Sequence, residues 1–159
     1  MSTFSEEIEK YFKVTDGKIC GFFKEYRFLS NYHGCAVRYN DCLYTSTEAA
    51  FQAAKSINPD DHKRFQNLSA AESKKEGRKL TLREDWESVK EQVMLDITFE
   101  KYKNLELKQQ LLATDPKDLE ETNHWGDTYW GVDYETGEGK NMLGKILMIV
   151  RAVLKAKTT

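Results

Sequence analysis

Two stretches of the chain carry hydrophobic residues at helical spacing over several turns. Between residues 84 and 102 the apolar side chains recur every three or four positions, as at Trp86, Val93 and Ile97. This period is typical of an amphipathic helix, so we predict one long helix here. The stretch KNMLGKILMIVRAVLKA, residues 140–156, is apolar on most of its sides. It predicts a central helix, because a helix that is hydrophobic all round is normally buried.

Shorter helices are predicted from their capping residues. Residues 58–61 place a proline at a first-turn position with two acids behind it, and residues 69–72 form an S-x-x-E capping box. Asn104 is a predicted cap for the helix that follows it. A further helix is expected over about residues 45–56. The T-x-x-E pattern near the N-terminus predicts a short amphipathic helix over about residues 1–15.

Strands are predicted in two places in the first third of the chain. KICGFF (residues 18–23) and the two halves of CAVRYNDCLYTS (residues 35–46) have the composition of short strands. Residues 40–41, Asn-Asp, suit the tight turn of a hairpin between those halves. Residues 24–34 and 122–141 fit neither period and are predicted loops, the second of them dense in aromatic residues and glycine.

Composition narrows the class of protein. The 159 residues are 40% hydrophobic and 31% charged, which is typical of a single globular domain. The net charge of −2 predicts no broad basic face for nucleic acid, although a local basic groove stays open. Three cysteines without a C-x-x-C pair and three scattered histidines argue against a disulfide framework and a metal centre. The N-terminus does not resemble a signal peptide and no run of about 18 apolar residues exists, so we expect a cytoplasmic protein without a membrane span.

The segment STEAAFQAAK, residues 46–55, places three polar side chains on one stripe of a predicted helix. At about 100° per residue, Glu48, Gln52 and Lys55 fall within roughly 60° of arc. A structural explanation is available, because Thr45 and Glu48 fit a capping box and a lysine near a helix end complements its dipole. The functional interpretation is a cleft wall, in which a desolvated lysine becomes a nucleophilic amine and the carboxylate transfers protons.

The loop HWGDTYWG is the second candidate site. Trp125 and Trp130 either cover the core as aromatic plugs or form a platform on which a planar base stacks. Asp127 lies between them and supplies a charge.

Four other residues are candidate contacts for a substrate. Asn141 follows a glycine-rich turn at the start of the C-terminal helix, a position that suits a phosphate. Ser30 and Asn31 offer a hydroxyl and an amide in the early loop. Arg78, at a predicted helix end, is suited to a bidentate grip on a phosphate.

These pieces, in this order, resemble the NADAR, or YbiA-like, family. The resemblance is carried by five blocks: F…FLSN, TEAAFQAAK, GR…R.DW…K…M, WG…WG and G.N.LG..LM..R. It covers about residues 18–155, and the order of the blocks makes it specific. It implies a helix-rich α+β domain with a small antiparallel sheet over residues 18–159, preceded by an N-terminal helical extension over residues 1–17.

The resemblance implies that the protein is a hydrolase that cleaves an N-glycosidic bond, without a cofactor or metal. Some members of the family remove ADP-ribose from guanine bases in nucleic acid. Others act on phosphorylated ribosylamino-pyrimidine intermediates of riboflavin synthesis. The resemblance also implies a lysine that forms a Schiff base with C1′ of the opened ribose. Lys55 is the lysine of the matching motif.

Candidate roles follow from the residues and the resemblance together. We expect Lys55 to be the nucleophile, and Glu48 or Asp127 to be the general acid, a choice that spacing leaves open. The expected substrate-binding residues are Ser30, Asn31, Gln52, Arg78, Trp125, Trp130 and Asn141.

The expected partner is a nucleotide or ADP-ribose-type substrate, with ADP-ribosylated DNA or RNA as its macromolecular form. The alternatives are the free riboflavin intermediate, a module that binds ADP-ribose or NAD without turnover, and an interaction protein that uses the tryptophan loop as an adhesive patch.

Overall fold

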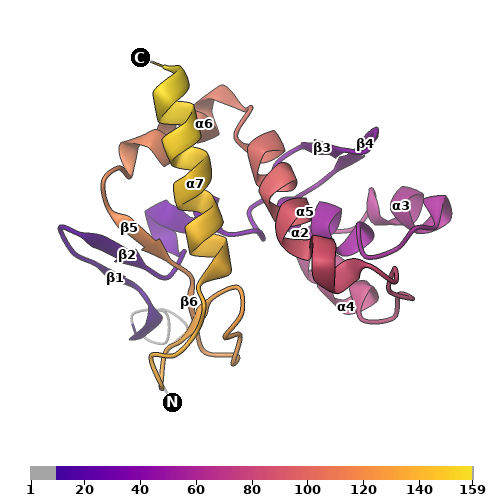
Figure 1. The fold of residues 1–159 in the computed structure, drawn as a ribbon, viewed down its shortest axis with the longest axis horizontal. Helices are drawn as coiled ribbons and strands as arrows, with labels where there is room; N and C mark the ends of the chain where they lie inside the picture. Colours follow the sequence, from indigo (N-terminus) through magenta and orange to yellow (C-terminus); the bar gives the residue numbers. More distant parts are fainter. Residues whose placement is uncertain (1–9, 159) are drawn as a thin grey trace. The chain divides into compact units, whose positions relative to one another are not determined.

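The computed structural model describes residues 10–158, which form two compact units (Figure 1). One unit comprises residues 10–30 together with residues 108–158, and the other comprises Asn31–Leu107. Each unit has its own buried apolar residues, and the two are described in turn. Helix α6 (Leu105–Ala113) crosses the boundary between them in sequence.

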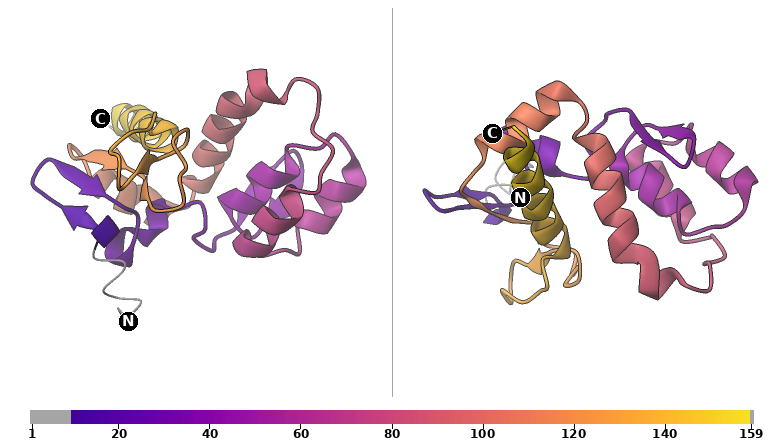
Figure 2. Two further views of the ribbon diagram at one scale, coloured as in Figure 1. Left: turned by 90° about the horizontal axis from the view of Figure 1, so that it is seen from below. Right: turned by 45° about the horizontal axis from the view of Figure 1, so that its top comes forward.

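The first unit is built on a three-stranded sheet in the order β1-β2-β5. Strand β2 (Lys18–Cys20) pairs antiparallel with β1 (Lys13–Val14) and parallel with β5 (Asp118–Glu120). The C-terminal helix α7 (Met142–Lys157) packs along β5, as the views in Figure 2 also show. This approach requires Gly144, because an added Cβ there would collide with the carbonyl oxygen of Leu119.

The remaining elements of the first unit are short. They are the 3₁₀ helix η1 (Lys24–Leu29) and the parallel pair β6 (Thr122–Asn123) and β7 (Val132–Asp133). The buried Arg151 of α7 donates to Thr114 Oγ1 at 3.0 Å and to the carbonyl oxygen of Lys117 at 2.7 Å. It therefore ties α7 to the turn that leads into β5.

The second unit surrounds the short helix α2 (Thr47–Ala53), all of whose residues are buried. It packs against α3 (Pro59–Phe65), α4 (Ala70–Gly77) and α5 (Trp86–Lys101). The hairpin of β3 (Val37–Tyr39) and β4 (Cys42–Tyr44) also contacts α2. A helix whose residues are all buried needs small side chains to pack closely against its neighbours, and the alanines of α2 provide them.

Most of the predicted elements are confirmed. The long helix appears as α5, and the capping box of residues 69–72 is fully formed. The hairpin turn has Asn40 and Asp41 at φ 48° and 64°, the left-handed values that an Asn-Asp turn accepts. The helix-rich α+β class is confirmed as well, by a solved structure compared below.

The direction of the strands differs from the expected antiparallel sheet. Pairs β1–β2 and β3–β4 are antiparallel, whereas β2–β5 and β6–β7 are parallel. The parallel partner β5 lies about a hundred residues after β2 in sequence, so local pattern does not reveal it. Short strands β6 and β7 also lie within residues 122–141, which were predicted to be loop.

The N-terminal helix is only partly testable. Its first nine residues lie outside the described part of the chain, and Lys10–Tyr11 are helical. Lys13–Val14, however, form strand β1 where the helix was expected to continue to about residue 15. The reason is a tight turn, in which the backbone N–H of Thr15 donates to the carbonyl oxygen of Lys18 at 2.9 Å and folds β1 back onto β2.

Two further findings concern membranes and metals. No helix in residues 10–158 combines the length and the apolar character needed to cross a bilayer. Over the same residues, His, Cys, Asp and Glu side chains do not gather in groups of three or more that would hold a metal ion.

Candidate functional site

Helix α2 is shorter than the expected range of about residues 45–56, since it spans Thr47–Ala53, and its N-cap lies one residue later than the sequence suggested. Its cap is Ser46, whose Oγ accepts from the backbone N–H of Ala49 at 3.1 Å. Thr45 instead donates its hydroxyl to the carbonyl oxygen of Leu68 at 2.5 Å. The predicted capping box of Thr45 and Glu48 is therefore wrong. Thr45 and Ser46 are adjacent hydroxyl residues that are both suited to cap a helix, and Ser46 is the one that does so. Glu48 is thus not needed to cap the helix.

Glu48 and Gln52 form a buried pair on α2. Their side chains are 6% and 4% exposed, and Gln52 Nε2 donates to Glu48 Oε1 at 2.8 Å. Burial of a charged group is costly unless it is hydrogen-bonded, and this bond meets that requirement in part. The polar stripe of α2 is therefore not a solvated surface.

Lys55 follows the end of α2 and is half-buried. Its Nζ lies 5.9 Å from the centroid of the Phe51 ring. Burial lowers the pKa of Lys55 below the usual 10.5, the charge of Glu48 opposes that shift, and the cations Lys74 and Arg78 add to it. A lowered pKa makes the neutral, nucleophilic amine more accessible than in an exposed lysine.

The backbone around Lys55 is fixed on both sides. Its N–H donates to the carbonyl oxygen of Gln52 at 3.2 Å, and its own carbonyl oxygen accepts from the N–H of Arg83 at 2.8 Å. These bonds fix the backbone of Lys55, two residues beyond the end of α2. The position from which its side chain extends is therefore defined.

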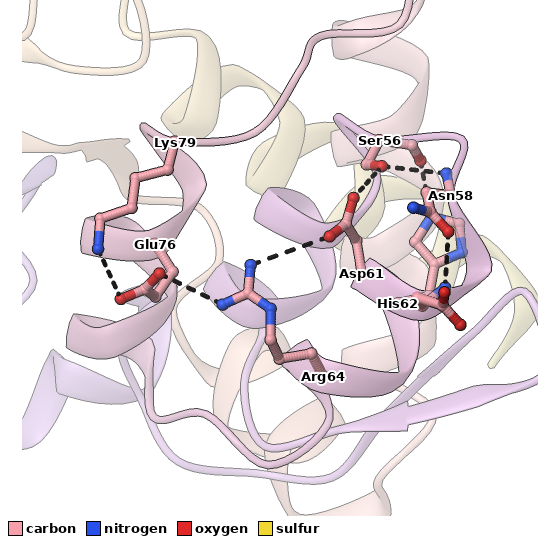
Figure 3. Close-up of polar contacts among 8 residues, drawn as sticks. Ser56, Asn58, Asp61, His62, Arg64, Glu76 and Lys79 are labelled. Carbon is pink, nitrogen blue, oxygen red and sulfur yellow. Dashed lines mark hydrogen bonds and ion pairs between the residues drawn. The ribbon is translucent and has the colours of Figure 1, made fainter.

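The next residue, Ser56, is held by a polar cluster (Figure 3). Ser56 Oγ donates to Asp61 Oδ2 at 2.6 Å and accepts from the N–H of Asn58 at 3.0 Å. His62 Nε2 donates to the carbonyl oxygen of Ser56 at 2.7 Å. Helix α3 therefore secures the segment that carries Lys55.

Two other predicted residues of this unit lie around α2. Asn31 accepts at its carbonyl oxygen from the N–H of Glu48 at 3.1 Å, and its Oδ1 accepts from Thr47 Oγ1 at 3.0 Å. It thereby fixes the first turn of α2. Arg78 is exposed at the end of α4 and close enough to Lys55 to lower its pKa. The structure thus brings Glu48, Gln52, Lys55, Asn31 and Arg78 together.

The other five predicted residues belong to the first unit: Ser30, Trp125, Asp127, Trp130 and Asn141. Asp127 Oδ1 accepts from the backbone N–H of Tyr129 at 3.0 Å and of Trp130 at 2.9 Å. The carboxylate therefore shapes the loop that carries Trp130. Asn123 supports the same turn, since it donates to the carbonyl oxygen of Asp127 and accepts from its N–H.

The two tryptophans differ in exposure. Trp125 is 54% exposed, and its ring meets His124 edge-on with centroids 5.0 Å apart. Trp130 is partly buried and meets Tyr129 edge-on at 4.9 Å. Trp125 is therefore the more exposed of the two rings.

Asn141 and Ser30 occupy structural positions. Asn141 has φ 53°, its Oδ1 accepts from the N–H of Glu121 at 3.0 Å, and its Nδ2 donates to the carbonyl oxygen of Leu119 at 2.8 Å. These bonds join the start of α7 to β5 and favour an architectural role over contact with a phosphate. Ser30 ends η1, where its N–H donates to the carbonyl oxygen of Arg27.

Sequence reasoning missed three residues that matter here. Lys74 lies four positions before Arg78 on α4, a spacing that places both on one helix face. Asn123 precedes Asp127 by four residues, and Gly77 stands at a helix position where glycine is otherwise unfavourable. The glycine within a predicted helix could be seen in the sequence, and it indicates that another part of the chain lies close to that position.

Comparisons with known proteins place the chain in one family. The family model of the NADAR domain matches residues 11–155. The N-glycosidase YbiA of Escherichia coli (strain K12) is 35% identical over 134 residues, which cover 82% of each chain. A riboflavin biosynthesis protein of Vibrio vulnificus (strain YJ016) is 35% identical over 135 residues, which cover 80% of this chain and 35% of the Vibrio protein.

A more distant relative and a solved structure agree with this placement. An N-glycosidase of Nostoc punctiforme is 29% identical over 137 residues and covers 82% of this chain and 86% of its own. The NMR structure of E. coli YbiA matches with a TM-score of 0.79 and 32% identity, over 93% of this chain and 90% of that one. The resemblance found in the sequence is confirmed: this chain belongs to the NADAR domain family.

Proposed function

We propose that this protein is an N-glycosidase that removes ADP-ribose from guanine bases in nucleic acid, with Lys55 as a nucleophile that forms a Schiff base. The observation that carries the proposal is the half-buried amine of Lys55, whose pKa is lowered by burial and which is near enough to the buried carboxylate of Glu48 for that charge to act on its pKa. The names of the relatives, which are N-glycosidases, support the reaction class.

The reaction balances with the amine alone as the nucleophile. The neutral nitrogen of Lys55 attacks C1′ of the ribose, and the bond from C1′ to the base nitrogen breaks. Of the two amine protons, one leaves with the base and the other passes to the ring oxygen as the ribose opens. The product is an imine between Lys55 and C1′. Water then adds to the imine, restores the amine and releases the sugar, which closes again.

Glu48 is the proposed proton carrier of these steps. In this proposal the carboxylate takes the proton released by the attack and delivers it to the departing nitrogen, directly or through a water molecule. Asp127, the second candidate, is engaged through Oδ1 with two backbone N–H groups of its own loop. This engagement supports Glu48 as the acid and leaves Asp127 the role of shaping the loop of Trp130.

The remaining proposed contacts follow from charge and exposure. Arg78 and Lys74 are cations near Lys55, and neither forms an ion pair within residues 10–158. An anionic substrate would neutralise both of them, which suits the diphosphate of ADP-ribose. The exposed ring of Trp125 is the proposed stacking surface for a base.

A second candidate substrate is a phosphorylated ribosylamino-pyrimidine of riboflavin synthesis. The name of the Vibrio relative favours it, although this chain covers only 35% of that protein. The chemistry at C1′ and the need for an anionic contact are the same in both cases. The two candidates therefore differ only in the base and in the group attached to the ribose 5′ position.

Product analysis tests the proposal. Purified protein is incubated in parallel with a guanine-ADP-ribosylated oligonucleotide and with the ribosylamino-pyrimidine phosphate, and the products are identified by mass spectrometry. The proposal expects unmodified oligonucleotide and free ADP-ribose from the first substrate. Ribose 5-phosphate from the second alone would assign the riboflavin intermediate instead. Intact substrates in both reactions would contradict N-glycosidase activity.

A further inference from the structure

The buried pair of Glu48 and Gln52 has an unusual partner on the neighbouring helix. Gly77 ends α4, and an added Cβ there would collide with Gln52 Oε1 and lie 2.7 Å from Gln52 Cδ and 3.2 Å from Gln52 Cβ. Glycine is the poorest helix former after proline, so its presence in the last turn of α4 calls for a reason. The reason is that the amide of Gln52 fills the space that any side chain at residue 77 would need.

The amide of Gln52 is held in one orientation by its bond to Glu48. Its Nε2 donates to Glu48 Oε1 at 2.8 Å, whereas its Oε1 is a buried acceptor without a hydrogen-bond partner among the described residues. An unsatisfied buried acceptor is destabilising. Turning the amide over would place Oε1 against the carboxylate oxygen of Glu48, where two acceptors would face each other. The orientation with Nε2 on Glu48 therefore suits an ionised Glu48, and it leaves Oε1 against the backbone of Gly77.

We infer that Gln52 and Gly77 are positioning residues that hold the carboxylate of Glu48 ionised and in one rotamer beside Lys55. Gly77 provides the space, the amide of Gln52 occupies it, and the amide N–H fixes the carboxylate. A hydrogen bond donated to a carboxylate favours its charged form. Glu48 therefore enters the reaction as a proton acceptor for the amine of Lys55, and acts as an acid only after it has received that proton.

This inference rests on the proposed function and adds two residues to it, neither of which has to touch the substrate. Oε1 of Gln52 is sealed from solvent by α4, so the amide is not available to a ligand through that atom. The expected effect of disturbing it is a loss of turnover and not of binding, because proton transfer requires the carboxylate within hydrogen-bond reach.

A double-mutant cycle tests the inference with the substrate that the wild type turns over faster. Gly77→Ala is expected to lower kcat about tenfold, as loss of one hydrogen bond to a charged group would, with KM within about twofold. In a Gln52→Ala background the collision is relieved, so Gly77→Ala is expected to lower kcat no further. Gly34→Ala is the matched control, because an added Cβ at Gly34 meets nothing within 4 Å.

A spectroscopic measurement checks the same bond without turnover. With ¹⁵N-glutamine labelling, the Nε2 proton that faces Glu48 is expected downfield of the other side-chain amide protons, and this shift is expected to be lost in Gly77→Ala. If Gly77→Ala does not fold, Gln52→Met takes its place and is expected to show the same tenfold fall in kcat.

Three results would overturn the inference: a folded Gly77→Ala with wild-type kcat, an equal effect of Gly77→Ala in both backgrounds, or a folded Gln52→Met with wild-type kcat. Each of them is seen with an active wild type, whereas a wild type inactive on both substrates contradicts the proposed function itself.

Discussion

Helix α2 and the loop of residues 123–130 each carry a carboxylate and an amide side chain, but they use these polar groups differently. In α2, Gln52 is bonded to another side chain, Glu48, and the pair is buried. In the loop, Asp127 and Asn123 are bonded to backbone groups of the loop itself. A carboxylate that satisfies backbone N–H groups maintains a conformation, whereas one held by a side chain can exchange protons without unfolding its surroundings. The comparison therefore supports the proposal that the chemistry belongs to α2, whereas the polar side chains of the loop maintain its conformation.

The largest effect is expected from removal of the amine. Lys55→Ala should lower kcat/KM by more than about 10³-fold, because the covalent route is lost. The midpoint of thermal unfolding should stay unchanged or rise, since a half-buried ammonium with a lowered pKa is no stabilising group. Steady-state kinetics and thermal denaturation provide the measurements. Lys63→Ala, an exposed lysine on α3, is the control and should behave as the wild type. Activity of Lys55→Ala within tenfold of the wild type would show that Lys55 is not the nucleophile.

Loss of the carboxylate should have the next largest effect. Glu48→Gln should lower kcat about 10²- to 10⁴-fold, the range for general acid–base groups. It should also shift the pH profile of any remaining activity. Glu48 raises the pKa of Lys55, so its removal lowers that pKa, and the rise of rate with pH should move to lower pH. A rise that moves to higher pH would show that Glu48 does not act on Lys55 in this way.

Removal of a cation near Lys55 should shift the pH profile of the rate in the opposite direction. Lys74 and Arg78 lower the pKa of Lys55, so Lys74→Met or Arg78→Met should raise it. At neutral pH less of the amine is then unprotonated, and the rate should fall several-fold, with the rising limb displaced to higher pH. Lys75→Met, an exposed neighbour on α4, is the matched control. An unchanged profile in both variants would separate these cations from Lys55.

The smallest effect is expected in the loop. Asp127→Asn keeps an oxygen that accepts from Tyr129 and Trp130, so stability should be close to wild type and turnover within about tenfold of it. Asp127→Ala should lower the free energy of unfolding by about 1–3 kcal/mol, because two backbone donors lose their acceptor. Chemical denaturation and kinetics distinguish the two variants. A greater loss of kcat in Asp127→Asn than in Glu48→Gln would reverse the roles of the two carboxylates.

Local chemistry predicted the elements that depend on nearby residues. The period of α5, the turn at Asn40 and Asp41 and the caps of α3 and α4 all follow from residues within a few positions of one another. The candidate stripe on α2 was found in the same way. Its cap was misplaced by one residue, because neighbouring hydroxyl groups have similar preferences and distant contacts decide between them.

The remaining features depend on contacts that pattern does not show. The parallel pairing of β2 with β5 joins segments about a hundred residues apart. The burial of the Gln52 amide depends on the approach of α4 to α2 at Gly77, and the engagement of Asp127 depends on the turn that Asn123 closes. Sequence therefore identified which residues carry polar chemistry, while the structure showed which of them are held by side chains and which by backbone.

The most direct test is to trap the intermediate. Protein turning over the ADP-ribosylated oligonucleotide is reduced with borohydride, digested and examined by mass spectrometry, with the ribosylamino-pyrimidine phosphate in a parallel reaction. The account predicts a reduced sugar adduct on the peptide that contains Lys55, and none in Lys55→Ala. Normal turnover without an adduct, or an adduct on a different lysine, would contradict it.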